Sequence, residues 1–188
     1  FRVCWYRREI VPPPMKPGER LVLHFGAVDY HATVWVNDWL AGTHEGGYTP
    51  FEADITDHVS AGERIRITAL INNILHWQSI PPGVIEDTPA GKRQRYWHDF
   101  FNYAGIHRNV WLYATNPAHF TDVTLTTDLD GSDGMITYAT EAENADGLET
   151  QVILLDADWN EQAMSAGASG TLSVPNVHKW APGDGYLY

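Results

Sequence analysis

Short apolar stretches alternate with polar residues along the whole chain, and none has the three-to-four-residue spacing of an amphipathic helix. Residues 64–71 (Arg-Ile-Arg-Ile-Thr-Ala-Leu-Ile) alternate strictly, as a strand with one buried face does. Pro12-Pro13-Pro14 ends an earlier run, because proline cannot donate to a strand ladder. Turn residues recur at the spacing typical of β-sandwiches. The sequence therefore predicts an all-β fold.

The alternation and the turn residues also place the individual strands. Strands are expected at residues 3–10, 21–25, 32–36, 39–42, 64–71 and 109–113, and then at 122–127, 135–140, 151–156 and 170–174. Asn37-Asp38 tolerates positive φ and predicts a hairpin turn, and residues 156–160 predict a second one. Residues 45–52 are expected to form a loop, and Tyr186-Leu187-Tyr188 looks like the start of a further strand.

Acidic and basic residues are distributed unevenly. At 188 residues the chain is one large or two small domains, and its net charge is −12. Residues 1–116 hold 12 acidic and 11 basic side chains, whereas residues 117–188 hold 12 acidic side chains and a single basic one, Lys179. This change predicts a domain boundary at Asn116-Pro117. The acidic balance argues against a nucleic-acid partner, whose phosphates require a basic surface.

Neither a membrane nor a secretory pathway is indicated. No apolar run approaches the ~20 residues that a transmembrane helix needs, and the first residues have no small-residue cleavage site after an apolar stretch. The one cysteine, Cys4, excludes an internal disulfide and favours a reducing compartment. A cytoplasmic location is therefore expected.

The segment 96–108 (Tyr-Trp-His-Asp-Phe-Phe-Asn-Tyr-Ala-Gly-Ile-His-Arg) breaks the alternating pattern on both sides of it. It combines many ring-bearing side chains with the carboxylate of Asp99 and the carboxamide of Asn102. Such a loop suits a sugar, whose C–H faces lie on aromatic rings and whose hydroxyls donate to carboxylates. The alternative is a buried aromatic corner that closes a sandwich, with Asp99 capping a turn.

Other candidate chemistry is weak. Hydrolysis of a glycoside needs two carboxylates that flank one bond. Asn160-Glu161 is expected at a surface turn, and Glu45 and Glu52 are expected to be loop carboxylates, so no catalytic pair is visible. The nine histidines are scattered and there is one cysteine, so no metal site is predicted. The sequence also contains no Gly-rich phosphate-binding loop, so no cofactor is predicted. Residues 92–95 (Lys-Arg-Gln-Arg) are predicted to be a solvated loop edge, with attraction of an anionic ligand left open.

A family resemblance covers nearly the whole chain. The segments that carry it are Trp5-Tyr6-Arg7-Arg8-Glu9, Val34-Trp35-Val36-Asn37, residues 44–54 (His-Glu-Gly-Gly-Tyr-Thr-Pro-Phe-Glu-Ala-Asp), Ile71-Asn72-Asn73, Ile80-Pro81-Pro82-Gly83, residues 99–108 (Asp-Phe-Phe-Asn-Tyr-Ala-Gly-Ile-His-Arg) and Trp180-Ala181-Pro182-Gly183 with Tyr186-Leu187-Tyr188. Together they resemble glycoside hydrolase family 2. The block at 99–105 favours the β-glucuronidase members over the galactosidase members.

The resemblance implies a particular architecture. Residues 1–116 would be a sugar-binding jelly-roll (galactose-binding-like) domain without its first strands. Residues 117–188 would be an immunoglobulin-like β-sandwich without its last strands, and a (β/α)₈ barrel outside this chain would hold both catalytic glutamates. Asp99 would reach into the mouth of the barrel and accept hydroxyl hydrogens from the sugar. Phe100, Asn102, Tyr103 and Arg108 would hold the shape of that loop.

The expected function is thus that of the non-catalytic N-terminal portion of a retaining hydrolase of terminal β-D-glucuronides. The portion alone is expected to be inactive and cofactor-free, and the parent enzyme is expected to be a homo-oligomer. A free-standing carbohydrate-binding module and a ligand-free structural sandwich remain alternatives, as does β-galactosidase-like specificity within the family.

Overall fold

A computed structural model describes residues 2–60, 62–98 and 101–188, and it confirms the predicted all-β class. The described residues contain strands and a single short helical turn, η1 (Thr56–His58), and none of their helices is long and apolar enough to cross a membrane. The chain divides into two compact units, Phe1–Asn116 (unit 1) and Pro117–Tyr188 (unit 2). The division lies at Asn116-Pro117, where the charge balance of the sequence changes.

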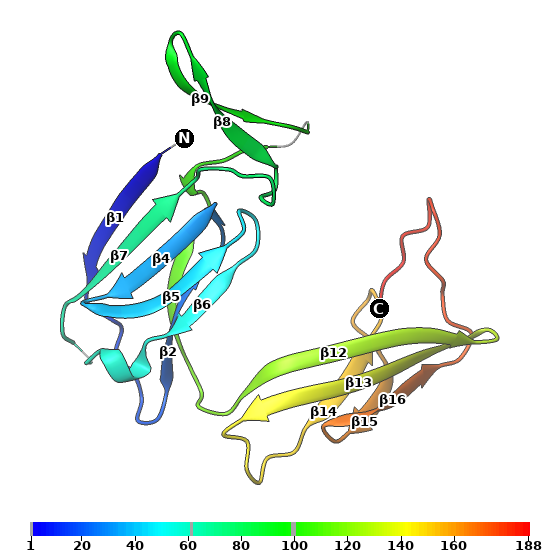
Figure 1. Ribbon diagram of the computed structural model, residues 1–188. Coiled ribbons are helices and arrows are strands. Elements are labelled where there is room, and N and C mark those ends of the chain that lie inside the picture. Colours follow the sequence, from blue (N-terminus) through cyan, green and yellow to red (C-terminus); the bar gives the residue numbers. More distant parts are fainter. Residues whose placement is uncertain (1, 61, 99–100) are drawn as a thin grey trace. The chain divides into compact units, whose positions relative to one another are not determined.

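Unit 1 is built from two main antiparallel sheets and two smaller strand pairs (Figure 1). Its strands are β1 (Val3–Ile10), β2 (Arg20–Phe25), β3 (Val28–Asp29), β4 (His31–Val36), β5 (Trp39–Glu45), β6 (Phe51–Asp54), β7 (Ile65–Asn72), β8 (Gly83–Thr88), β9 (Gly91–Tyr96), β10 (Gly105–Ile106) and β11 (Val110–Thr115). One sheet has the order β1-β7-β4-β5 and the other the order β11-β2-β6, while β3 pairs with β10 and β8 with β9.

The core of unit 1 is formed by the inward-facing residues of both sheets. Leu21, Leu23 and Phe25 of β2 are buried together with alternate residues of β4 and β7. Burying one such side chain contributes about 1.5–3 kcal/mol, so this face fixes the register of each strand. A slip of one residue would turn every core side chain towards solvent.

The turn between β4 and β5 confirms the hairpin predicted at Asn37-Asp38. Asn37 has a φ of 53°, a conformation that asparagine tolerates better than most residues. Its side-chain Oδ1 accepts the backbone N–H of Arg66 at 3.0 Å, and Arg66 also forms an ion pair with Asp38 at 2.7 Å. The turn is therefore tied to the neighbouring strand β7.

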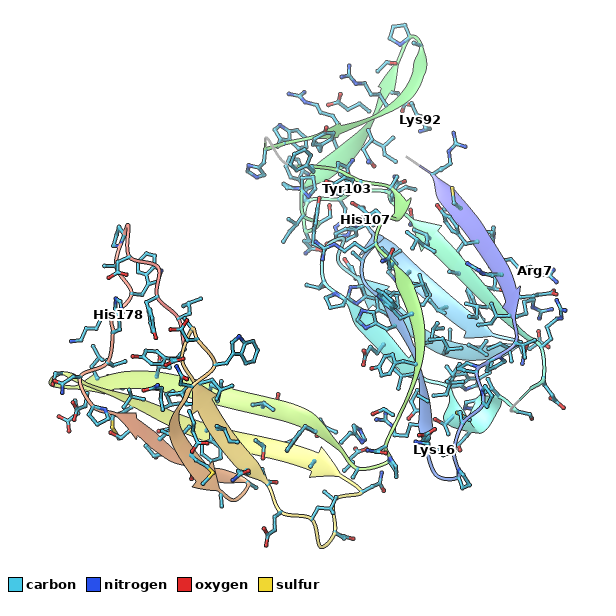
Figure 2. All side chains as sticks on the ribbon, turned by 180° about the vertical axis from the view of Figure 1, so that it is seen from behind. Arg7, Lys16, Lys92, Tyr103, His107 and His178 are labelled. Atoms are coloured by element: carbon cyan, nitrogen blue, oxygen red, sulfur yellow. The ribbon has the colours of Figure 1, made fainter. Side chains whose placement is uncertain are left out.

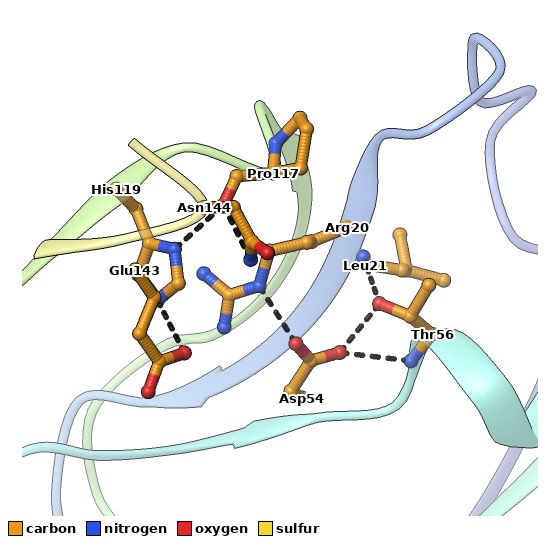
Figure 3. Close-up of polar contacts among 8 residues, drawn as sticks. All are labelled: Arg20, Leu21, Asp54, Thr56, Pro117, His119, Glu143 and Asn144. Atoms are coloured by element: carbon orange, nitrogen blue, oxygen red, sulfur yellow. Dashed lines mark hydrogen bonds and ion pairs between the residues drawn. The ribbon is translucent and has the colours of Figure 1, made fainter. Parts of the chain in front are cut away.

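Side-chain hydrogen bonds connect neighbouring segments at two further places, one in each unit (Figure 3). In unit 1, Arg20 donates to Asp54 at 2.7 Å, and the Thr56 hydroxyl accepts the N–H of Leu21 at 2.8 Å. These bonds connect β2 to the end of β6. In unit 2, the Pro117 carbonyl accepts hydrogen bonds from the side chains of both His119 and Asn144.

Unit 2 consists of β12 (His119–Asp130), β13 (Asp133–Glu143), β14 (Gln151–Leu155), β15 (Glu161–Ala166) and β16 (Ser169–Val174). The strands β12, β13 and β16 form one sheet, and β14 pairs with β15. Tyr138 is buried, and its hydroxyl donates to Ser165 at 2.9 Å. The turn predicted at 156–160 is present, with Asp156 accepting the backbone N–H groups of Asp158 and Asn160.

Three sequence expectations are wrong. Residues 92–95 are not a loop edge but lie in β9, paired with β8. The segment 45–52 is not all loop, because Glu45 is the last residue of β5 and Glu52 lies in β6. Residues 186–188 are not in a strand. Tyr186 stacks on His178 at 4.2 Å, and the Tyr188 hydroxyl accepts the His178 N–H. Both faces of β9 are largely exposed, so no apolar alternation marks it in the sequence.

Candidate functional site

The segment 96–108 is held to unit 1 at both of its ends. At its start Trp97 stacks on Trp77, with ring centroids 4.6 Å apart, and the guanidinium of Arg95 lies 5.1 Å from the Trp97 ring centroid. The backbone N–H of Trp97 donates to the Pro82 carbonyl at 3.1 Å. Stacked rings and a cation over an aromatic face each contribute about 0.5–1.5 kcal/mol. This end is therefore held by Trp77 and Pro82, which precede β8, and by Arg95 of β9.

At the other end, aromatic rings and the loop 46–48 hold residues 101–107. Tyr103 stacks on His107 (both labelled in Figure 2), with centroids 4.7 Å apart. Phe101 in turn stacks on Tyr103. His107 Nε2 donates to the Gly47 carbonyl at 2.6 Å, which requires the proton to be on Nε2. The Tyr48 hydroxyl donates to the Phe101 carbonyl. The segment thus has a fixed attachment on each side of residues 99–100.

Gly105 is required where this segment joins the sandwich. It has a φ of +80°, which favours glycine, and an added Cβ would collide with the hydroxyl of Tyr6. It begins β10 and pairs with Asp29 of β3, while Ile106 pairs with Val28. This two-residue pairing sets the chain next to a buried carboxylate.

That carboxylate belongs to Asp29, which is 0% exposed. Neither of its oxygens accepts a hydrogen bond of normal length and angle from the residues that the structure describes. Burial raises the pKa of the Asp29 carboxyl from 3.8 to about 6, against the opposing effects of His107 and the Tyr103 backbone N–H. The loop 46–48 passes on its other side, where the Gly46 N–H donates to the Tyr30 carbonyl at 3.0 Å.

The structure describes only some of the site residues that were predicted from the sequence. Asp99 and Phe100 lie outside the described residues. Asn102 is half-buried, and its Oδ1 is buried without a hydrogen-bond partner in the described part of the chain. Tyr103 is 44% exposed at its place in the ring stack, and the exposed Arg108 lines an open groove with Trp111. Their role in shaping the loop therefore stays a prediction.

The remaining carboxylates considered above form no pair across a cleft. Glu52 accepts hydrogen bonds from His24 and Tyr113, both at 2.8 Å, and Glu45 lies 3.4 Å from His76. Burial raises the pKa of Glu52, but the hydrogen bonds from His24 and Tyr113 outweigh it and lower that pKa overall. Glu161 is exposed at the start of β15. Within the described ranges no three His, Cys, Asp or Glu side chains are grouped so as to hold a metal ion.

Sequence reasoning missed Asp29, Gly47 and Trp77, which attach the segment 96–108. Asp29 stands in Gly26-Ala27-Val28-Asp29, where a carboxylate between apolar strand residues signals either a turn or a buried charge. Only the pairing of β3 with β10, 76 residues further along the chain, distinguishes the two. Trp77 gave no signal, because its partner Trp97 follows β9, a strand that the sequence does not mark.

Unit 1 is a β-sandwich that carries the ring-rich segment 96–108. Residues 2–117 match the family described as "Glycosyl hydrolases family 2, sugar binding domain". Because that match covers more than half of the chain, the chain belongs to glycosyl hydrolase family 2, as the resemblance implied.

The similar proteins are β-glucuronidases. The β-glucuronidase of Paenibacillus borealis is 45% identical over 190 residues, which are 98% of this chain and 32% of that protein. The solved structure of an uncultured Clostridium sp. β-glucuronidase is 37% identical with a TM-score of 0.79, covering 98% of this chain and 31% of that one. A Ruminococcus gnavus β-glucuronidase in complex with D-glucuronic acid is 31% identical, also with a TM-score of 0.79 and with 98% and 32% covered.

This chain therefore spans about a third of the length of the relatives it matches. The named relatives are all β-glucuronidases, so they give no support to the alternative of β-galactosidase-like specificity.

Proposed function

We propose that the chain is the non-catalytic N-terminal portion of a retaining β-glucuronidase-like hydrolase. Family membership and the β-glucuronidase relatives support this reading, and the chain's share of their length leaves room for a separate catalytic domain. In this proposal the two catalytic glutamates lie outside residues 1–188, and unit 2 is the immunoglobulin-like sandwich that precedes the barrel. The substrate is a terminal β-D-glucuronide. One solved relative is described in complex with D-glucuronic acid.

Asp99 is the sugar contact in this proposal. The observation that carries it is the attachment of the segment on both sides of Asp99, at Trp97 and at residues 101–107. Holding a loop at both ends reduces the conformational entropy that is lost when the loop binds a ligand. A carboxylate presented in this way accepts hydroxyl hydrogens and fixes the sugar for attack by groups of the barrel. Asp99 itself transfers no proton.

Replacing Asp99 by Ala in the full-length enzyme should lower kcat/KM for an aryl β-D-glucuronide roughly tenfold or more. The physical reason is the loss of a hydrogen bond to a charged group, about 1.5–3 kcal/mol. Steady-state kinetics at constant pH measure this. Asp87→Ala is the matched control, because Asp87 is an exposed carboxylate on β8. Equal kcat/KM for Asp99→Ala and wild type would remove the proposed contact.

A second candidate function, a free-standing carbohydrate-binding module, is favoured by a different surface. On the outer face of the β1-β7-β4-β5 sheet, Trp5 is 66% exposed and stacks on Trp35 at 5.7 Å. These indoles line an open groove of about 420 Å³ with Arg7, Arg66 and Thr68 among its walls. Calorimetry of chain 1–188 with glucuronides separates the two functions: micromolar affinity favours the module, and no measurable heat favours the hydrolase portion.

A further inference from the structure

Asp29 is a buried charge for which the sandwich provides no ordinary partner. Its side chain is 0% exposed, and neither oxygen accepts a hydrogen bond of normal length and angle from the described residues. An isolated carboxylate in such a position costs several kcal/mol unless its surroundings compensate. A polar group kept at that cost in a core points to a role other than packing.

The surroundings of Asp29 identify the compensating groups. On one side Gly47 is so close that an added Cβ would lie 3.0 Å from Oδ2. β10 pairs with Asp29 at Gly105, and the backbone N–H of Tyr103 and the imidazole of His107, on either side of Gly105 in the chain, lower the pKa of the Asp29 carboxyl against the effect of burial. Both belong to the segment that follows Asp99. The pairing of Asp29 with Gly105 brings that segment to it.

Among the described residues, Asp29 also acts on two phenols, those of Tyr30 and Tyr48. Burial raises the pKa of Tyr30, with smaller contributions from Glu45 and from Asp29, and burial and then Asp29 raise that of Tyr48. His107 is thus the basic side chain among the described groups that act on Asp29. Its Nε2 is committed to the Gly47 carbonyl, so the loop 46–48, His107 and Asp29 form one packed unit.

We propose that Asp29 is a positioning residue. Its buried carboxylate draws the Tyr103 backbone N–H and the His107 ring into place, and thereby sets the segment that carries Asp99. Removing the carboxylate leaves the ring stack and the β3–β10 pairing, but it removes the charge that favours one position of residues 101–107. The effect on the substrate passes through Asp99, so this inference rests on the proposed function.

A double-mutant cycle in the full-length enzyme tests this directly. The variants are Asp29→Asn, Asp99→Ala and the double variant, with Asp57→Asn as a control because Asp57 is exposed in η1. Asp29→Asn is expected to lower kcat/KM for an aryl β-D-glucuronide roughly fivefold at pH 7.5, and to change it less than about twofold when Asp99 is already Ala. The same fold loss in both backgrounds, or no loss in either, would overturn the inference.

The dependence of kcat/KM on pH distinguishes a positioning role of the charged carboxylate from a merely structural role of the side chain. The wild-type advantage over Asp29→Asn should be greatest above pH 6, where the carboxylate is ionised, and should approach onefold near pH 5. A ratio that does not change with pH would also overturn the inference. If Asp99→Ala keeps the wild-type kcat/KM, the proposed sugar contact of Asp99 is wrong. If Asp99→Ala lowers kcat/KM but Asp29→Asn does not, only the positioning role of Asp29 is wrong.

Should Asp29→Asn not fold, Gly47→Ala takes its place in the cycle. Gly47 does not have a positive φ, so alanine can adopt its backbone conformation. The added methyl would lie 3.0 Å from Asp29 Oδ2 and displace the carboxylate. The expected result is again a loss of kcat/KM that disappears in the Asp99→Ala background. A loss that persists unchanged in that background counts against Asp29 as a positioning residue.

Discussion

At the scale of single residues, Asp29 couples the stability of unit 1 to pH. The folded chain holds the Asp29 proton with a pKa of about 6, whereas the ordinary value is 3.8. Between these values unfolding releases a proton, so the free energy of unfolding falls as pH rises through this window and stays lower above it. A tenfold change in proton affinity equals about 1.4 kcal/mol, so the whole effect is at most about 3 kcal/mol.

Asp29→Asn should remove this pH dependence. We expect the free energy of unfolding of the variant, minus that of wild type, to rise by up to about 3 kcal/mol between pH 4 and pH 7. Every other titrating group is shared by the two proteins and cancels in the difference. Urea denaturation at a series of pH values measures it. A difference that is constant across this range would mean that the Asp29 carboxyl keeps its ordinary pKa in the folded chain.

At the scale of elements, β10 depends on one glycine. Gly105→Ala forces a side chain into a conformation with φ of +80° and against the Tyr6 hydroxyl, and we expect a loss of about 1–3 kcal/mol of stability. Gly91→Ala is the matched control, because Gly91 has a φ of +109° but nothing within 4 Å of its added Cβ. The difference between the two melting temperatures measures the steric part.

Tyr6→Phe removes the hydroxyl that the new methyl would meet, so it should partly restore the stability of Gly105→Ala. A double variant that melts no higher than Gly105→Ala alone would show that the Tyr6 contact is not the cause. The segment 101–107 should also lose protection from hydrogen exchange in Gly105→Ala, because the β3–β10 pairing holds it to the sandwich.

The elements that the sequence predicts well are those with one buried face. β2, β4 and β7 lie where alternation and turn residues place them, because burial on one side imposes a period of two. The pair β8–β9 is invisible in the sequence, since charged side chains cover both of its faces. β10 is only two residues long, too short for any periodicity, and only long-range pairing with β3 creates it.

At the scale of the whole molecule, fold class and family follow from the sequence. The candidate site is predictable only in part. The ring-rich segment 96–108 stands out by composition, but its attachments to Trp77, Gly47 and Asp29 join residues that are distant along the chain. No local pattern encodes such contacts. The activity belongs to a longer protein in the proposal, because the chain spans about a third of its relatives.

The central claim is that this chain contributes a sugar contact rather than a reaction centre. The most direct test is a crystal structure of the full-length enzyme bound to a β-D-glucuronide or a close analogue. We predict a carboxylate oxygen of Asp99 at roughly 2.5–3.0 Å from a sugar hydroxyl, with both catalytic glutamates outside residues 1–188. A bound sugar with no hydroxyl within roughly 3.5 Å of Asp99 would contradict the claim.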